Sequence, residues 1–137
     1  MPGKLASGRH PVSPSSAAAP SVPKQLWTVD ASLTPGSPVS DIGELSAAAA
    51  GAVRAGGGTV LDSSHVIFPN GAVTLVLILA ESHLAIHTWP EDNLIAIDLF
   101  SCGAIDGHRV AAELARLLGL DQVHMRQIER GTVRPGR

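Results

Sequence analysis

Several residue types are scarce in this chain of 137 residues, and each scarcity excludes a class of protein. Cys102 is the only cysteine, so no intrachain disulfide can hold the fold together. The formal net charge is -2, without the basic excess that nucleic-acid binding requires. The longest apolar run, residues 72–80, contains Thr74 and is too short to span a bilayer, so we expect no membrane partner.

The rest of the composition predicts one folded domain preceded by an arm. Hydrophobic residues make up 45% of the chain and charged residues 16%, so most of it should fold around a single core. Residues 1–23 are rich in proline, serine and alanine, which predicts a disordered arm before a domain over 24–137. No apolar stretch typical of a secretory signal lies near the N-terminus, so we expect a cytoplasmic protein.

Hydrophobic periodicity predicts six strands and two helices. Strands are expected at about 25–32, 59–68, 72–80, 83–89, 94–101 and 122–128. Asp41 is a candidate N-cap, with Glu44 placed to complete a capping box, for a helix that ends before the glycines at 56–58. A second amphipathic helix, over about 106–118, should place Val110, Leu114 and Leu117 on one stripe.

The order of these elements predicts the fold class. Short turn signals such as Pro69-Asn70-Gly71 separate neighbouring strands and favour antiparallel pairing. The order β-α-β-β-β-β-α-β therefore predicts an α+β two-layer sandwich, in which two helices cover one face of a mainly antiparallel sheet.

The residues able to carry chemistry gather in the central strands, where three generic sites are open. His83 and His87 could bind a metal with His65, although a strand holds the first two too far apart to chelate unaided. Ser82 could serve a hydrolase, but the G-x-S-x-G elbow is absent. Cys102 could be a nucleophile activated by His87. For any one residue alone, a purely structural place in the sheet is the simplest interpretation.

Together, these residues form two unusual blocks, Glu81-Ser-His-Leu-Ala-Ile-His-Thr-Trp-Pro-Glu91 and Asp98-Leu-Phe-Ser-Cys-Gly103. The blocks and their spacing resemble the prokaryotic S-adenosylmethionine decarboxylase family. Its proenzymes carry Glu-Ser-His-x-x-Ile-His-Thr-Trp-Pro-Glu followed by Asp-x-Phe-x-Cys-Gly. The resemblance extends more weakly, without gaps, from about Leu26 to Gly131, which covers the domain but not the arm.

The resemblance implies a pyruvoyl-dependent enzyme that uses neither a metal nor pyridoxal phosphate. Self-cleavage would separate Glu81 from Ser82 through an ester, and Ser82 would become the pyruvoyl group that forms a Schiff base with the substrate amine. His87 matches the histidine that assists the elimination step. Cys102 matches the proton donor in decarboxylation, a task that suits a thiol. Ser82 and His87 lie five positions apart, so an ideal strand would point them to opposite faces, and a distortion at Glu81-Ser82 is expected.

Other positions depart from the family or match it less closely. Thr74 stands where the family has a serine that helps processing, and Asp30 aligns with a glutamate of the substrate site. Trp89 matches an aromatic position and Phe68 lies at or next to another, where it is the better candidate for stacking on adenine. Core packing is the alternative role for both rings. The family's tyrosine-containing turn after Glu91 is missing, since the chain has no tyrosine.

The implied activity is conversion of S-adenosylmethionine to decarboxylated S-adenosylmethionine, for the synthesis of spermidine and other polyamines. Decarboxylation of arginine or ornithine is the alternative, because it would use the same catalytic residues. A homologue that has lost catalysis and binds a partner is a third hypothesis. The family also implies a homodimer of processed protomers, which a sheet with an open face or edge would fit.

Overall fold

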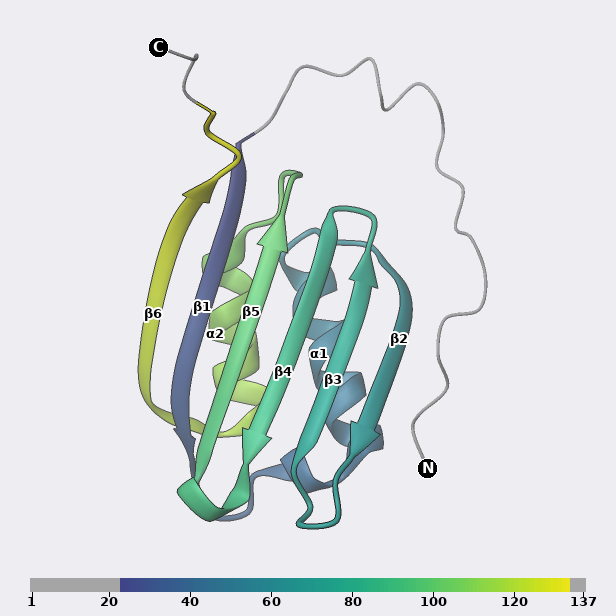
Figure 1. Cartoon of the computed structure of the whole chain (residues 1–137), viewed down its shortest axis with the longest axis vertical. Helices are drawn as coiled ribbons and strands as arrows, with labels where there is room; N and C mark the ends of the chain where they lie inside the picture. The colour runs from purple at the N-terminus through teal and green to yellow at the C-terminus, as the bar shows by residue number, and fades with distance from the viewer. Residues whose placement is uncertain (1–22, 134–137) are drawn as a thin grey trace.

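The computed structural model describes residues 23–133, which contain every helix and strand that the periodicity predicts (Figure 1). The predicted arm, apart from Pro23, lies outside the described residues. The main elements are β1 (Lys24–Leu33), α1 (Ile42–Ala55), β2 (Val60–Ile67), β3 (Val73–Leu79), β4 (Ser82–Trp89), β5 (Leu94–Ser101), α2 (Gly107–Leu118) and β6 (Leu120–Arg130). Short 3-10 turns at Pro38–Ser40 and Pro90–Asp92 precede α1 and β5.

The six strands form one antiparallel sheet in the order β2-β3-β4-β5-β1-β6. Strands β2 to β5 are neighbours because tight turns join them. In the turn before β3, the Phe68 N–H donates to the Ala72 carbonyl at 2.8 Å, and Gly71 has a φ of 86° that favours glycine. β1 lies between β5 and β6, which brings the two ends of the domain together. Both helices lie behind the sheet in Figure 1, as the predicted two-layer sandwich requires.

Both helices begin at aspartate caps. The Asp41 carboxylate accepts the Glu44 N–H at 3.0 Å, and that of Asp106 accepts the Arg109 N–H at 3.1 Å. The other half of the predicted capping box is wrong. The Asp41 N–H already donates to the Pro38 carbonyl at 3.0 Å, within the 3-10 turn, so the Glu44 side chain is not needed there.

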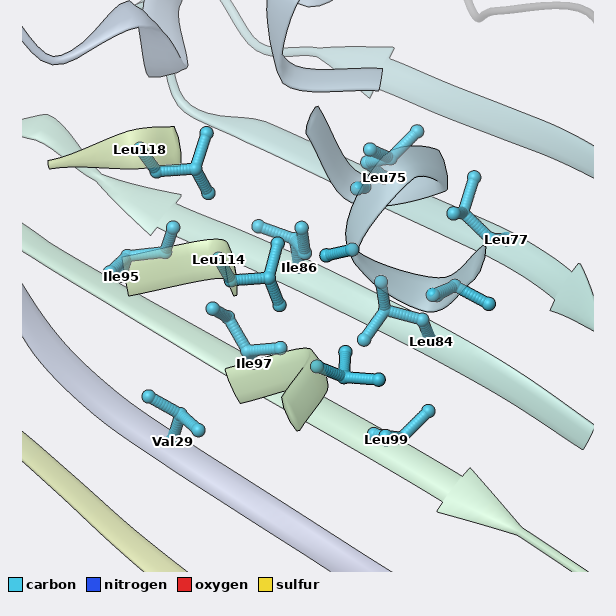
Figure 2. Close-up of a cluster of buried hydrophobic side chains, with 14 of the residues drawn as sticks. Val29, Leu75, Leu77, Leu84, Ile86, Ile95, Ile97, Leu99, Leu114 and Leu118 are labelled. Carbon is cyan, nitrogen blue, oxygen red and sulfur yellow. The ribbon is translucent and has the colours of Figure 1, made fainter. Parts of the chain in front are cut away.

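The core lies between the helices and one face of the sheet (Figure 2). Alternate residues of the central strands face the helices and are 2% exposed or less: Leu75, Leu77, Leu84, Ile86, Ile95 and Ile97. Leu114 and Leu118 of α2 lie over them. The prediction that Leu117 belongs to this stripe is wrong. The helix turns Leu118 onto the sheet, and Leu117 borders a hollow beside α1.

No helix in the described range covers the other face of the sheet, which is the open face. Register places Val76, Ala85 and Phe100 there, beside polar residues of the same strands. Ile78 and Trp89 lie on this face and are 37% and 38% exposed. Residues 23–133 contain no helix long and apolar enough to cross a membrane.

The rotation of α2 predicts unequal costs for two neighbouring leucines. Leu118→Ala should lower the free energy of unfolding by about 2 to 5 kcal/mol, because it empties a fully buried site. Leu117→Ala is the matched control and should cost less than half as much, since its side chain is half-buried. Urea unfolding followed by circular dichroism would measure both. Equal losses would contradict this orientation of the helix.

Candidate active site

The predicted site residues form two groups at opposite ends of β4. Ser82 begins the strand and pairs with Leu79 of β3 and Ser101 of β5. His87 pairs with Thr74 of β3 and Ala96 of β5. Ser82 and His87 are five positions apart on an extended strand, a separation of about 16 Å along β4. We call the two groups the Ser82 group (Glu81, Ser82, Cys102) and the His87 group (Phe68, Thr74, His87, Trp89).

In the Ser82 group, backbone hydrogen bonds hold the peptide carbonyl that precedes Ser82. The Cys102 N–H donates to the Glu81 carbonyl oxygen at 2.8 Å. The Glu81 side chain is also held, since its Oε1 accepts the Thr59 N–H at 3.0 Å. Gly103 lies so close to Glu81 that a Cβ at residue 103 would stand 2.7 Å from the Glu81 Cγ. The Glu81 carbonyl is therefore fixed in direction and carries a hydrogen-bond donor on its oxygen.

Ser82 has the backbone distortion that the sequence predicts at this point. Its φ is 141°, in a region that side-chain-bearing residues rarely adopt. A residue held in such a conformation costs on the order of 1–3 kcal/mol, which the surrounding strand pairing must offset. This distortion does not bring Ser82 to His87, because the length of the strand still separates them.

Cys102 lies in a turn just after β5, and its side chain is exposed. The turn is organised by Ser101, which is fully buried at 0% exposure. The Ser101 hydroxyl accepts the Gly103 N–H at 3.0 Å and donates to the Gly103 carbonyl at 3.3 Å. The thiol at residue 102 thus stands on a fixed turn beside the Glu81-Ser82 peptide.

The His87 group borders a pocket of about 330 Å³ on the open face. The Thr74 hydroxyl lies 3.1 Å from the His87 Nδ1, so the predicted processing pair is in hydrogen-bond contact. The ring of Trp89 is 6.1 Å from that of His87. Phe68, which is 45% exposed, completes the aromatic lining. The pocket is of the size that small ligands occupy and combines apolar rings with a few polar groups.

Asp30 lies apart from both groups. It shares a row of the sheet with Ala96 and His87, two strands away from the histidine, and it is exposed. It borders a separate shallow hollow with Asp92 and His124. Its predicted contact with substrate therefore needs a ligand that extends along the row.

The other generic sites gain no support from the geometry. No cluster of three His, Cys, Asp or Glu side chains that could hold a metal occurs within residues 23–133. His65 pairs with buried Leu75, on the face opposite to His83 and His87. A larger hollow of about 520 Å³ lies between the helices, but none of the predicted site residues borders it.

Three residues that contact or support the Ser82 group were not singled out from the sequence. Gly103 and Ser101 are part of the second block, and Ser101 is at one of its variable positions, so only its burial draws attention to it. Thr59 contributes a backbone N–H. Any residue except proline supplies that group, so no side-chain pattern could have identified it.

Comparison with known proteins finds similar sequences and a similar structure. The family model described as S-adenosylmethionine decarboxylase matches residues 25–131. An S-adenosylmethionine decarboxylase proenzyme 2 of Bacillus anthracis is 36% identical over 107 residues, which cover 77% of this chain and 83% of that protein. A proenzyme of Thermotoga maritima is 43% identical over 77 residues, 55% of this chain and 58% of that one. The crystal structure of the adenosylmethionine decarboxylase from Aquifex aeolicus has a TM-score of 0.66 and 25% identity, covering 87% of this chain and 98% of the other.

The backbone of Ser82 predicts an unusual effect of glycine. Ser82→Gly should be more stable than Ser82→Ala by roughly 1 kcal/mol or more, since glycine adopts this φ without strain. At Ser64 in β2, whose φ is ordinary, the same pair should show the reverse order by about 0.5 to 1 kcal/mol. Thermal unfolding of the four variants would measure the difference. An alanine preference at both positions would contradict strain at Ser82.

Proposed function

This chain belongs to the S-adenosylmethionine decarboxylase family, and we propose that it cleaves itself at Glu81-Ser82 and then decarboxylates S-adenosylmethionine. The observation that carries the proposal is the hydrogen bond from the Cys102 N–H to the Glu81 carbonyl oxygen, beside a strained Ser82. The product would be decarboxylated S-adenosylmethionine, the aminopropyl donor of spermidine and other polyamine synthesis. A cytoplasmic location is part of the proposal.

Cleavage begins with the Ser82 Oγ attacking the carbonyl carbon of Glu81. The Glu81 carbonyl oxygen gains negative charge in the tetrahedral intermediate, and the Cys102 N–H already points at it from 2.8 Å. The C–N bond then breaks, the Ser82 nitrogen takes the proton, and an ester joins Glu81 to the serine oxygen. Strain at Ser82 favours this step, because the rearranged chain is free to leave the unfavourable φ.

The next step removes the α-proton of Ser82 and expels Glu81 as a carboxylate. The remaining dehydroalanine takes up water and loses ammonia to give the pyruvoyl group. A base for the α-proton must come within hydrogen-bond reach. His87, in contact with Thr74, has the right chemistry but stands at the far end of the strand in its own chain.

A second copy of the chain would bring its His87 group close to Ser82 of the first copy. The open face carries exposed Ile78 and Trp89 among polar side chains and is uncovered by any described helix, so it suits a self-complementary interface. Suppose that two open faces pack together and that the two-fold axis lies between them, perpendicular to the strands. Each end of β4 in one protomer then lies over the opposite end of β4 in its partner. The His87 group of one protomer then faces the Ser82 group of its partner. We therefore propose a homodimer with two composite sites, each completed by the partner's half.

The processed site has the residues that a pyruvoyl enzyme needs. The group forms from Ser82 itself, at a half-buried strand end beside an exposed thiol, so the site fits it. When formed, it supplies a ketone that captures the substrate amine and accepts electrons as carbon dioxide leaves. Cys102 Sγ then returns a proton to the substrate carbon.

The His87 group supports S-adenosylmethionine as the substrate. Phe68 and Trp89 offer apolar ring faces in the pocket beside His87, which suit a flat adenine base. Arginine and ornithine have no such base. The names of the relatives also favour S-adenosylmethionine over arginine or ornithine. Asp30, in the same row of the sheet as His87, would attract the positive charge of the substrate.

Purified wild-type protein should separate into residues 1–81 and 82–137, and the second fragment should resist Edman sequencing because its N-terminus is a ketone. The cleaved protein should release carbon dioxide from S-adenosylmethionine faster than from arginine or ornithine. Intact mass spectrometry and a labelled-carboxylate assay would test both. A chain that stays whole after long incubation would contradict self-cleavage, and preferred turnover of arginine or ornithine would contradict the substrate.

Composite sites predict that two inactive variants rescue each other. Ser82→Ala and His87→Ala should each fail to release fragments alone. Co-expressed, they form mixed dimers in which one site holds both an intact Ser82 and the partner's intact His87. The chain carrying His87→Ala should then be cut, as a mass tag would reveal. Co-expression of His87→Ala with the double variant is the control and should give no fragments. Absence of cleavage in the first mixture would contradict the exchange of groups between protomers.

A further inference from the structure

We propose that the buried hydroxyl of Ser101 is a positioning group for self-cleavage, because it fixes the turn that presents the Cys102 N–H to the Glu81 carbonyl. The inference rests on the cleavage reaction proposed above and assigns it a residue that takes no part in the bond changes. The Ser101 hydroxyl bonds to neither the breaking peptide bond nor substrate in this assignment. It acts through the backbone of the next residue.

Burial of Ser101 needs an explanation. Thr88 and Ser101 are the two buried polar side chains among the described residues. The Thr88 hydroxyl accepts the Val73 N–H at 2.9 Å and so joins β4 to the start of β3. The Ser101 hydroxyl instead makes both of its hydrogen bonds to Gly103, two residues along the chain. Its polar atom is therefore used to set the shape of the 101–103 turn and bonds to no other element.

The shape of this turn determines where the Cys102 N–H points. Ser101 is held in β5 by pairing with Ser82 and Gln25, and its hydroxyl ties down Gly103 on the other side. Cys102 is the residue between these two fixed points, and its N–H reaches the Glu81 oxygen at 2.8 Å. Loss of the Ser101 hydroxyl would leave the Gly103 N–H without its acceptor and let the turn relax.

The acceptor side of the same hydrogen bond is held independently. The Glu81 carboxylate accepts the Thr59 N–H at 3.0 Å, and Gly103 leaves no room for Glu81 to move toward the turn. If the turn shifted, the Cys102 N–H would therefore lose its hydrogen bond to the Glu81 carbonyl oxygen, since Glu81 cannot follow the turn. Removing a backbone-type donor from a developing oxyanion slows reactions by roughly 100- to 1000-fold. Misplacing the donor should have a smaller effect, on the order of tenfold or more.

The test measures the rate of fragment formation in Ser101→Ala, with hydroxylamine present in parallel samples to split any ester. Ser101→Ala should cleave more slowly by about tenfold or more, without a build-up of ester, because the acyl shift itself is impaired. Ser101→Thr keeps the hydroxyl and should recover much of the rate. Ser37→Ala is the matched control. Its hydroxyl donates to the Leu118 carbonyl at 2.5 Å, far from the cleavage site, so it should lose stability but cleave at the wild-type rate.

Each contrary outcome has a separate meaning. A wild-type chain that never cleaves would overturn the proposed function itself. Wild-type cleavage with an unchanged rate in Ser101→Ala would overturn only the role of Ser101. So would slow cleavage with accumulated ester, which places the defect in elimination. A rate that follows the melting temperature equally in Ser101→Ala and Ser37→Ala would also overturn it, because the hydroxyl would then be merely structural.

Discussion

Burial on one side of the sheet is the constraint on which the other features depend. Two helices cover one face, so every second residue of the central strands must be apolar and close-packed, as Leu84, Ile86 and Ile97 are. The residues between them point to the open face and can be polar. His87 and Thr74 therefore share the open face, where their side chains can meet each other and a ligand. The same arrangement leaves Ile78 and Trp89 exposed on a face that no described helix covers.

Strand length sets the second constraint. Ser82 and His87 are both carried by β4, but pairing along the whole strand keeps it extended, so its two ends cannot approach within one chain. A hydrogen bond between Thr74 and His87 holds the histidine at one end, and the Cys102 N–H holds the Glu81 carbonyl at the other. Each half is held by hydrogen bonds within its own chain. Such preorganisation would suit the proposed site assembled from two copies, because little ordering would be left for association to complete.

Local strain and a local donor coincide at the Glu81-Ser82 peptide. Strand pairing forces Ser82 into a rare φ, while the turn after β5 supplies an N–H to the carbonyl next to it. Glu81 lies in the turn between β3 and β4, and Ser82 is the first residue of β4. The pairing of β4 with β3 and β5 therefore fixes one side of the proposed cleavage bond. The buried Ser101 hydroxyl accepts the Gly103 N–H and so also holds the turn after β5.

The sequence by itself determined the two-layer fold, the strands and helices to within a few residues, and the two blocks that carry Ser82, His87 and Cys102. These follow from local periodicity, caps and motifs, which are written in neighbouring residues. It also predicted a distortion at Ser82, because Ser82 and His87 lie five positions apart, an odd spacing that would point them to opposite faces of a strand. Only the tertiary structure decided that the two groups stand at opposite ends of a strand, that Leu118 instead of Leu117 meets the sheet, and that Thr59 and Ser101 lie beside the Glu81-Ser82 peptide. The physical reason is that these depend on cross-strand register, helix rotation and backbone N–H groups, and such features arise between segments that are distant in the chain.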